Sequence, residues 1–276
     1  MCNECGCGVP AGAENHPTHS HPHDLDHSHP PVPGHPEAHD HPHDHPADRL
    51  EAAARSLTEE RRTLVVRQAI LDKNDRLAER NRGFFQARGL LVLNVLSSPG
   101  SGKTTLIQKT IQSLQGRLKT GVIVGDLATD NDARRLRTTG APVVQINTGT
   151  MCHLDAEMVT RSLRQIDLDG LGLLIIENVG NLVCPAAYDL GETLRVVLLS
   201  VTEGEDKPLK YPPVFQSADV AILSKMDLAT ACNYQREAAL ANIRQVGSHA
   251  RIFELSAQTG QGLEPWCEFV IQQAKL

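Results

Sequence analysis

The most constraining feature of the sequence is the segment Ser97–Thr104, which reads Ser-Ser-Pro-Gly-Ser-Gly-Lys-Thr. It directly follows the apolar run Leu90–Leu96 and opens a helical pattern. A glycine-rich turn in this position lets backbone amides point at a phosphate group, and the helix N-terminus adds a favourable dipole. An incidental Gly/Ser-rich turn is the alternative. The strand–loop–helix context favours a phosphate-binding loop, although Ser97 stands where the usual pattern has glycine.

The side chains of this loop have predicted roles in binding a nucleotide. We expect Lys103 to reach the β- and γ-phosphates, and the Thr104 hydroxyl to ligate Mg²⁺. The further residues predicted to contact the nucleotide are Gly100, Ser101, Gly102 and Thr105.

From Leu90 onward, short apolar runs alternate with segments of helical periodicity. Runs that are apolar throughout are typical of strands buried on both faces, and their alternation with helices indicates a doubly wound, mostly parallel sheet. The predicted fold class is therefore α/β of the P-loop type. The predicted strands are Leu90–Leu96, Val122–Gly125, Val143–Ile146, Leu171–Ile176, Leu194–Val201, Val220–Leu223 and Arg251–Leu255. The predicted helices are Lys103–Gln115, Asp130–Thr138, Asp155–Gln165, Tyr234–Val246 and Gly262–Ala274.

Two acidic residues stand where predicted strands end. Glu177 follows Leu171–Ile176, and Asp126 follows Val122–Gly125. A carboxylate there can approach the magnesium ion or the attacking water of a nucleotide site. Solvated loop acids and helix caps are also common at strand ends, and that alternative stays open for both residues. The predicted catalytic set is Lys103, Thr104, Asp126 and Glu177.

The segment Ser224-Lys225-Met226-Asp227 is similar to the Asn-Lys-x-Asp element of guanine-specific P-loop proteins. The Asp227 carboxylate can accept hydrogen bonds from guanine N1 and N2, which adenine does not supply, and the Lys225 stem can cover the base. Ser224 replaces asparagine, so we expect weaker bracing of this loop. A second segment, Ser256-Ala257-Gln258, follows the last predicted strand and resembles the Ser-Ala-Lys loop that lines guanine in such proteins. Its predicted contacts are Ser256 and Ala257. Together the two segments favour GTP over ATP.

The first 46 residues differ in composition from the rest, since they hold nine of the 16 prolines and eleven of the 13 histidines. Proline fixes φ and removes backbone donors, so we expect this part to be extended or disordered. Residues 47–89 contain no proline and carry apolar residues near helical spacing, which predicts a helix that stops at Gly89. The predicted division is a cysteine motif (1–10), a His/Pro-rich tract (11–46), a helical segment (47–89) and a P-loop domain (90–276).

Cys2, Cys5 and Cys7 form a Cys-x-x-Cys-Gly-Cys cluster. Thiolates at this spacing can chelate one soft or borderline cation, either square-planar Ni²⁺ or tetrahedral Zn²⁺. An unligated redox-active cluster is the alternative. The histidines that follow are irregularly spaced among aspartates, which indicates a multi-ion buffer for nickel, copper or zinc rather than an expression tag.

A third candidate for metal binding lies within the predicted P-loop domain. Cys152 and His153 follow the predicted strand Val143–Ile146, and Cys184 lies seven residues beyond Glu177. If Glu177 senses the γ-phosphate, metal affinity can depend on the bound nucleotide. Ordinary core packing is the alternative, because the set supplies few ligands. Pairing across a two-fold dimer can supply the missing ones.

Charge, apolar run length and cysteine usage disfavour several classes of function. A net charge of −6 argues against nucleic acid as the main partner. The apolar runs are too short to span a bilayer, and no secretory signal pattern is present. Seven cysteines, three of them within the first seven residues, indicate metal or redox chemistry in the cytoplasm rather than a disulfide framework.

The sequence resembles the hydrogenase nickel-incorporation GTPases, the accessory proteins that help insert nickel into nickel–iron hydrogenases. The resemblance rests on the cysteine cluster, the His tract, the phosphate loop and three further segments, and it covers nearly the whole chain. Those segments are Asn74-Asp75-x-x-Ala78-x-x-Asn81-Arg82, Cys152-His153-Leu154-Asp155-Ala156 and Glu177-Asn178-Val179-Gly180-Asn181-Leu182-Val183-Cys184-Pro185.

This resemblance implies a P-loop GTPase that binds GTP, GDP and Mg²⁺ and turns over slowly. It implies a second nickel or zinc site, near the interface of a nucleotide-promoted homodimer, as well as a tight nickel site in the cysteine cluster. The implied partners are a small zinc-containing nickel chaperone and the hydrogenase large subunit. The tight site is Cys2, Cys5 and Cys7, and the second site is Cys152, His153 and Cys184.

Two other interpretations of the sequence remain. The urease-maturation GTPases share the phosphate loop and the internal metal residues, but the N-terminal cysteine cluster favours the hydrogenase branch. A metal store, in which the His tract is the working part and nucleotide turnover is incidental, is the second interpretation.

Overall fold

The computed structural model of the chain describes residues 46–127 and 129–275. The predicted metal ligands Cys2, Cys5 and Cys7 and the His/Pro-rich tract lie outside the described residues.

Seven strands form one sheet in the order β3-β2-β4-β1-β5-β6-β7. Each neighbouring pair in this order is parallel, which confirms the predicted α/β class with a parallel sheet. β1 occupies the centre, so the loop that follows it leaves the middle of the carboxyl edge. The strands are β1 (Leu91–Ser97), β2 (Thr120–Asp126), β3 (Val143–Asn147), β4 (Leu173–Glu177), β5 (Leu194–Ser200), β6 (Val220–Ser224) and β7 (Arg251–Glu254).

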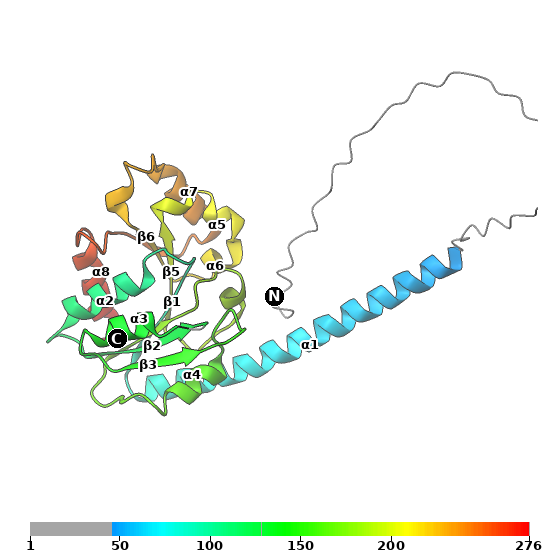
Figure 1. The fold of residues 1–276 in the computed structure, drawn as a ribbon, viewed down its shortest axis with the longest axis horizontal. Coiled ribbons are helices and arrows are strands. Elements are labelled where there is room, and N and C mark those ends of the chain that lie inside the picture. Colours follow the sequence, from blue (N-terminus) through cyan, green and yellow to red (C-terminus); the bar gives the residue numbers. More distant parts are fainter. Residues whose placement is uncertain (1–45, 128, 276) are drawn as a thin grey trace, which may run out of the picture.

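Helices cover both faces of the sheet (Figure 1). Successive residues of β1 point to opposite faces: Leu93 and Val95 join one core cluster, whereas Val92 and Leu96 join the clusters on the other face. The first face is covered by α2 (Lys103–Leu114), α3 (Asn131–Arg137) and α8 (Leu263–Gln273). The second face is covered by α1 (Pro46–Ala87), α4 (Ala156–Ser162), α6 (Pro212–Gln216) and α7 (Arg236–Val246).

Several short helical turns escape the sequence analysis because each is only three to five residues long. Besides α6 these are η1 (Cys184–Ala187), η2 (Val201–Glu203), α5 (Lys207–Lys210) and η3 (Met226–Leu228). None of the described helices combines the length and apolar character that a bilayer span requires.

The helix α1 packs against the sheet and its loops through its C-terminal part. The side chains of residues 61–70 are exposed, and Figure 1 shows the preceding part of the helix extending away from the sheet. The apolar side chains Leu64 and Val65 therefore cover no core, although their spacing helped to predict the helix. Among the side chains of α1 whose burial the structure describes, the buried ones share one helix face and are Asn74, Ala78, Asn81 and Phe85.

The segment before β5 packs tightly on α1 at Gly191. This residue has a φ of +86°, and a Cβ there would lie 2.5 Å from the Ala78 carbonyl oxygen and 2.8 Å from the Arg82 nitrogen. Gly116 has a similar φ of +76°, but a Cβ at that position would have no neighbouring atom within 4 Å. Gly116 therefore provides a matched comparison for the packing at Gly191.

We predict that Gly191→Ala lowers the free energy of unfolding more than Gly116→Ala does. Backbone strain at positive φ costs about 1–2 kcal/mol at either position, and overlap with α1 adds roughly 1–3 kcal/mol at Gly191 only. Urea unfolding of the full chain measures both values. Equal losses for the two variants would contradict the close packing of α1 at Gly191.

Candidate nucleotide and metal site

The loop between β1 and α2 has the backbone that its sequence predicts. Gly100 has a φ of +74° and Gly102 a φ of +99°, which is the left-handed region that glycine adopts without strain. Lys103 begins α2 directly after Gly102, so the first backbone amides of the helix are available to an anion.

Ser97 has a clear structural role at the position where the usual pattern has glycine. Its hydroxyl accepts a hydrogen bond from Lys103 Nζ at 2.9 Å, and it also bonds to the Ser101 hydroxyl. Lys103 is buried, and this burial lowers the pKa of its amine, while the nearby Glu177 raises it. The amine is thus held inside the loop, where a phosphate group would meet it.

Thr104 and Glu177 meet across this loop, as the sequence predicts for a magnesium site. The Thr104 hydroxyl donates to Glu177 Oε1 at 2.7 Å, while Glu177 Oε2 is buried and makes no hydrogen bond to the described residues. Burial raises the pKa of Glu177 to about 7. A hydroxyl and a buried carboxylate oxygen are ligands that suit Mg²⁺, so the residues present fit this ion.

Asp126 ends β2, and its Oδ2 accepts from the Thr129 hydroxyl at 2.9 Å. A further acid of this region, Asp132 in the first turn of α3, was missed by the sequence analysis. Both charges raise the pKa of Glu177 and that of Lys103, so both carboxylates act electrostatically on the site. Asp132 had no signal in the sequence, because it lies inside a helix rather than at a strand end.

The predicted base-recognition segment is clamped to the phosphate loop. The buried Ser224 hydroxyl donates to the Ser101 carbonyl at 2.8 Å, and Lys225 Nζ donates to the Gly100 carbonyl at 2.7 Å. The Ser224 hydroxyl therefore joins the two loops, and the expectation that serine braces them less well than asparagine stays a prediction. Lys225 adopts a φ of +58° and places Asp227 on the exposed turn η3.

The second predicted base loop lies beside the first. The Met226 amide donates to the Leu255 carbonyl at 3.2 Å, which joins the two loops. Ser256 is buried, and its hydroxyl accepts from the Thr259 amide at 3.1 Å. Ser256 and Ala257 thus follow β7 at the same edge of the sheet as Asp227.

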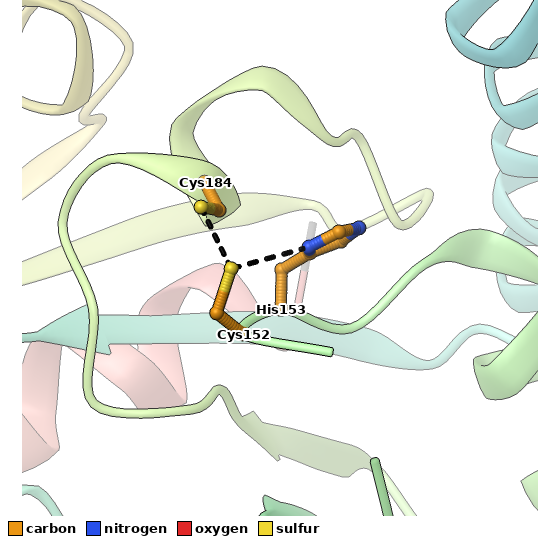
Figure 2. Close-up of side chains that lie close together, drawn as sticks. All are labelled: Cys152, His153 and Cys184. Carbon is orange, nitrogen blue, oxygen red and sulfur yellow. Dashed lines mark hydrogen bonds between the residues drawn. The ribbon is translucent and has the colours of Figure 1, made fainter. Parts of the chain in front are cut away.

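Cys152, His153 and Cys184 form a second cluster, shown in Figure 2. Their ligand atoms lie within 4.8 Å of one another, although Cys152 follows β3 and Cys184 begins η1. The two sulfurs are 2.7 Å apart, and Cys152 Sγ is 4.0 Å from His153 Nδ1. The two thiols face each other and His153 Nδ1 faces Cys152 (Figure 2), so the three ligand atoms meet in one place, which ordinary core packing does not require. Two thiolates and an imidazole suit zinc or nickel.

The fold and these two clusters define a class, that of P-loop nucleotide-binding proteins with a candidate site for a soft metal. The family model described as "CobW/HypB/UreG, nucleotide-binding domain" matches residues 91–254. The chain is 53% identical to the hydrogenase maturation factor HypB of Azotobacter chroococcum mcd 1 over 77% of this chain and 70% of that protein. It is 51% identical to HypB of Escherichia coli K12 over 78% of this chain and 74% of that protein.

Two solved structures share the fold. HypB from Archaeoglobus fulgidus matches with a TM-score of 0.69 and 39% identity, covering 74% of this chain and 99% of that one. HypB from Helicobacter pylori in complex with nickel matches with a TM-score of 0.70 and 40% identity, covering 74% of this chain and 95% of that one. The chain therefore belongs to the CobW/HypB/UreG family of nucleotide-binding proteins and, within it, to the HypB hydrogenase maturation factors.

We predict that Glu177 makes stability depend on pH when neither nucleotide nor metal is bound. The folded-state pKa of about 7 exceeds the ordinary value of 4.5, so the stabilising effect of the protonated form is full below pH 4.5 and is lost as the pH rises through 7. Relative to Glu177→Gln, the natural chain should lose on the order of 1–3 kcal/mol in unfolding free energy between pH 5 and pH 8. Urea unfolding at both pH values gives the difference, and identical pH dependence in the two proteins would rule out this account of Glu177.

Proposed function

We propose that this protein is a GTP-hydrolysing nickel chaperone that helps insert nickel into a nickel–iron hydrogenase during maturation. One observation carries the proposal: a single loop, residues 177–184, holds Glu177 against the phosphate loop and Cys184 in the metal cluster. The relatives named hydrogenase maturation factors support the process, and the related structure in complex with nickel supports the metal.

Guanine specificity is proposed to come from Asp227, whose carboxylate would accept from the N1 and N2 hydrogens of the base. The bond from Ser224 to the Ser101 carbonyl fixes the base loop relative to the phosphate loop. Base recognition and phosphate binding would then occur at one fixed separation, which suits a nucleotide bound across both loops.

Hydrolysis is proposed to depend on the residues around the phosphate loop. Lys103 would neutralise charge that develops on the transferred phosphate. Glu177 would orient the magnesium ion or the attacking water. Mg²⁺ held by Thr104 and Glu177 would supply further positive charge. We expect slow intrinsic turnover, because the sequence identifies no arginine finger.

Nickel, as the cargo, is proposed to bind Cys152, His153 and Cys184, with Zn²⁺ as the competing ion. Three protein ligands leave a position for a fourth. A groove of about 260 Å³ lies beside His153, between α1 and α4, and could admit a ligand from another molecule. A second copy of this chain, in a nucleotide-promoted homodimer, is the proposed source of the missing ligand.

The partners and the compartment are proposed from the same family resemblance. We propose a small zinc-containing nickel chaperone as a partner, the hydrogenase large subunit as the recipient of nickel, and the cytoplasm as the compartment. Cys2, Cys5 and Cys7 are proposed as a tight nickel site, and the His tract as added storage.

We predict that Asp227→Asn lowers the affinity for GDP and GTP by roughly 10- to 100-fold, the value of a charged hydrogen bond to the base. Xanthine nucleotides should bind Asp227→Asn more tightly than they bind the natural chain, because xanthine presents an acceptor where guanine presents an amine. Titration with fluorescent nucleotides measures both. Asp167→Asn, at an exposed loop residue that bonds only its own turn, is the matched control. Unchanged guanine affinity in Asp227→Asn would remove the base-recognition role.

We predict that Cys184→Ser abolishes nickel binding by the internal cluster. The test uses the full chain with Cys2, Cys5 and Cys7 replaced by serine, which we call the internal-site parent. Nickel is titrated into this protein, and the thiolate-to-nickel charge-transfer absorption is measured. Nickel bound to the histidine tract does not contribute to this signal, because imidazoles give no such band. The exposed Cys232, replaced by serine, is the matched control and should change nothing.

The same titration, repeated with GDP and with a non-hydrolysable GTP analogue, tests nucleotide gating. We expect two different nickel affinities in the internal-site parent. A band that survives Cys184→Ser, or equal affinities with the two nucleotides, would contradict the proposed function.

A further inference from the structure

Besides the contact of Glu177 with Thr104, the loop after β4 touches the phosphate loop at Gly180. A Cβ on Gly180 would lie 3.1 Å from Pro99 Cα and 3.2 Å from Pro99 N, so the two backbones are in close contact. Because Pro99 belongs to the phosphate loop, a change in that loop on binding a phosphate group acts directly on the segment around Gly180.

His153 is tied to β1 through Asn178, the residue that directly follows β4 and whose own amide donates to the Val95 carbonyl at 3.1 Å. The amide of the next residue, Leu154, donates to the buried Asn178 Oδ1 at 3.2 Å, and Asn178 Nδ2 donates to Asn94 Oδ1 of β1 at 3.2 Å. The His153 ring also stacks on Tyr188, with 3.9 Å between the ring centres. Buried polar groups that satisfy one another in this way resist movement.

Tyr188 is fixed by the same frame. Arg195 Nη2 donates to the Tyr188 carbonyl at 3.0 Å and forms a buried ion pair with Glu192 at 2.8 Å. Glu192 Oε1 in turn accepts from Asn94 Nδ2 at 3.0 Å. The ring that covers His153 and the amide that follows it therefore connect to a single residue of β1.

Cys152 has a different attachment. Asn181, one residue after Gly180, donates from Nδ2 to the Cys152 carbonyl at 3.4 Å, and its Oδ1 accepts from the Val183 amide at 2.9 Å. Asn181 is half-buried and lies on the same loop as Cys184. One side chain thus joins the backbone of one thiol ligand to the loop that carries the other.

We propose that Asn181 is the positioning residue that couples the metal cluster to the nucleotide. It ties Cys152 to the part of the loop that Gly180 presses on the phosphate loop. Asn178, at the start of this loop, is bonded to Asn94 and Val95 of β1, and together with Tyr188 it holds His153 beside the sheet. Movement of the loop then shifts the two sulfurs together relative to the imidazole, which changes the fit of the three ligands to one ion. This inference rests on the proposed nucleotide-gated binding of nickel.

The test measures nickel affinity in the internal-site parent and in the same protein carrying Asn181→Ala, each with GDP and with a non-hydrolysable GTP analogue. The readout is the ratio of the two nickel dissociation constants, from the thiolate charge-transfer band. We expect Asn181→Ala to move this ratio toward one by roughly 2- to 30-fold. Nucleotide affinities measured without nickel should stay at the parent values, because Asn181 makes no hydrogen bond to the phosphate loop.

Two further variants distinguish a loss of coupling from a change in the shape of the loop after β4. Asn181→Asp keeps the acceptor for the Val183 amide and loses the donor to Cys152, so we expect it to lose the coupling as Asn181→Ala does. Asn242→Ala is the matched control, since Asn242 is also half-buried and also donates to a backbone carbonyl, that of Glu205 at 2.9 Å. It should keep the parent ratio.

A parent ratio that persists in Asn181→Ala or in Asn181→Asp would overturn the role of Asn181 and leave nucleotide gating in place. A ratio of one in the parent itself would overturn the gating as well. The two failures are therefore distinguishable within one set of titrations.

Discussion

The pairing of β1 with β4 is the constraint on which both sites depend. The strands are parallel, with Val95 opposite Glu177, and the Asn178 amide donates to the Val95 carbonyl at 3.1 Å. Both strands therefore end at the same edge, and the phosphate loop and the loop 177–184 leave the sheet side by side. Without this register, Thr104 could not meet Glu177, and Gly180 could not rest on Pro99.

Burial of two opposite charges gives the nucleotide site its chemical character. Desolvation lowers the pKa of Lys103 and raises that of Glu177, so both groups are driven toward neutrality. A bound triphosphate favours the charged amine, and a divalent cation favours the ionised carboxylate, because each brings the opposite charge. Ligand binding and the charge state of this pair are therefore linked.

Much of this arrangement could be predicted from the sequence, because it follows from local patterns. The apolar runs predicted all seven strands, and the glycines at 100 and 102 marked the phosphate loop. Cys152, His153 and Cys184 could be named as candidate ligands because cysteine and histidine are chemically distinctive and because the segments that carry them resemble those of a known family. The three ligand atoms do come together.

What escaped prediction depends on contacts between distant segments. The bond from Ser224 to the Ser101 carbonyl spans 123 residues, so no local pattern in the sequence could predict it. Asn181 and Tyr188 carry no signature of their own, because an asparagine in a loop or an aromatic ring is common anywhere. Their roles appear only when the fold sets them beside Cys152 and His153.

Coupling of nickel and nucleotide through one loop can be measured from the nucleotide side. Linkage requires nickel to change nucleotide affinity by the same factor by which nucleotide changes nickel affinity. The measurement is the affinity of the internal-site parent for GDP and for a non-hydrolysable GTP analogue, with and without saturating nickel, in excess magnesium. Coupling through this loop predicts that nickel changes the ratio of the two affinities. A ratio that nickel leaves unchanged would contradict it.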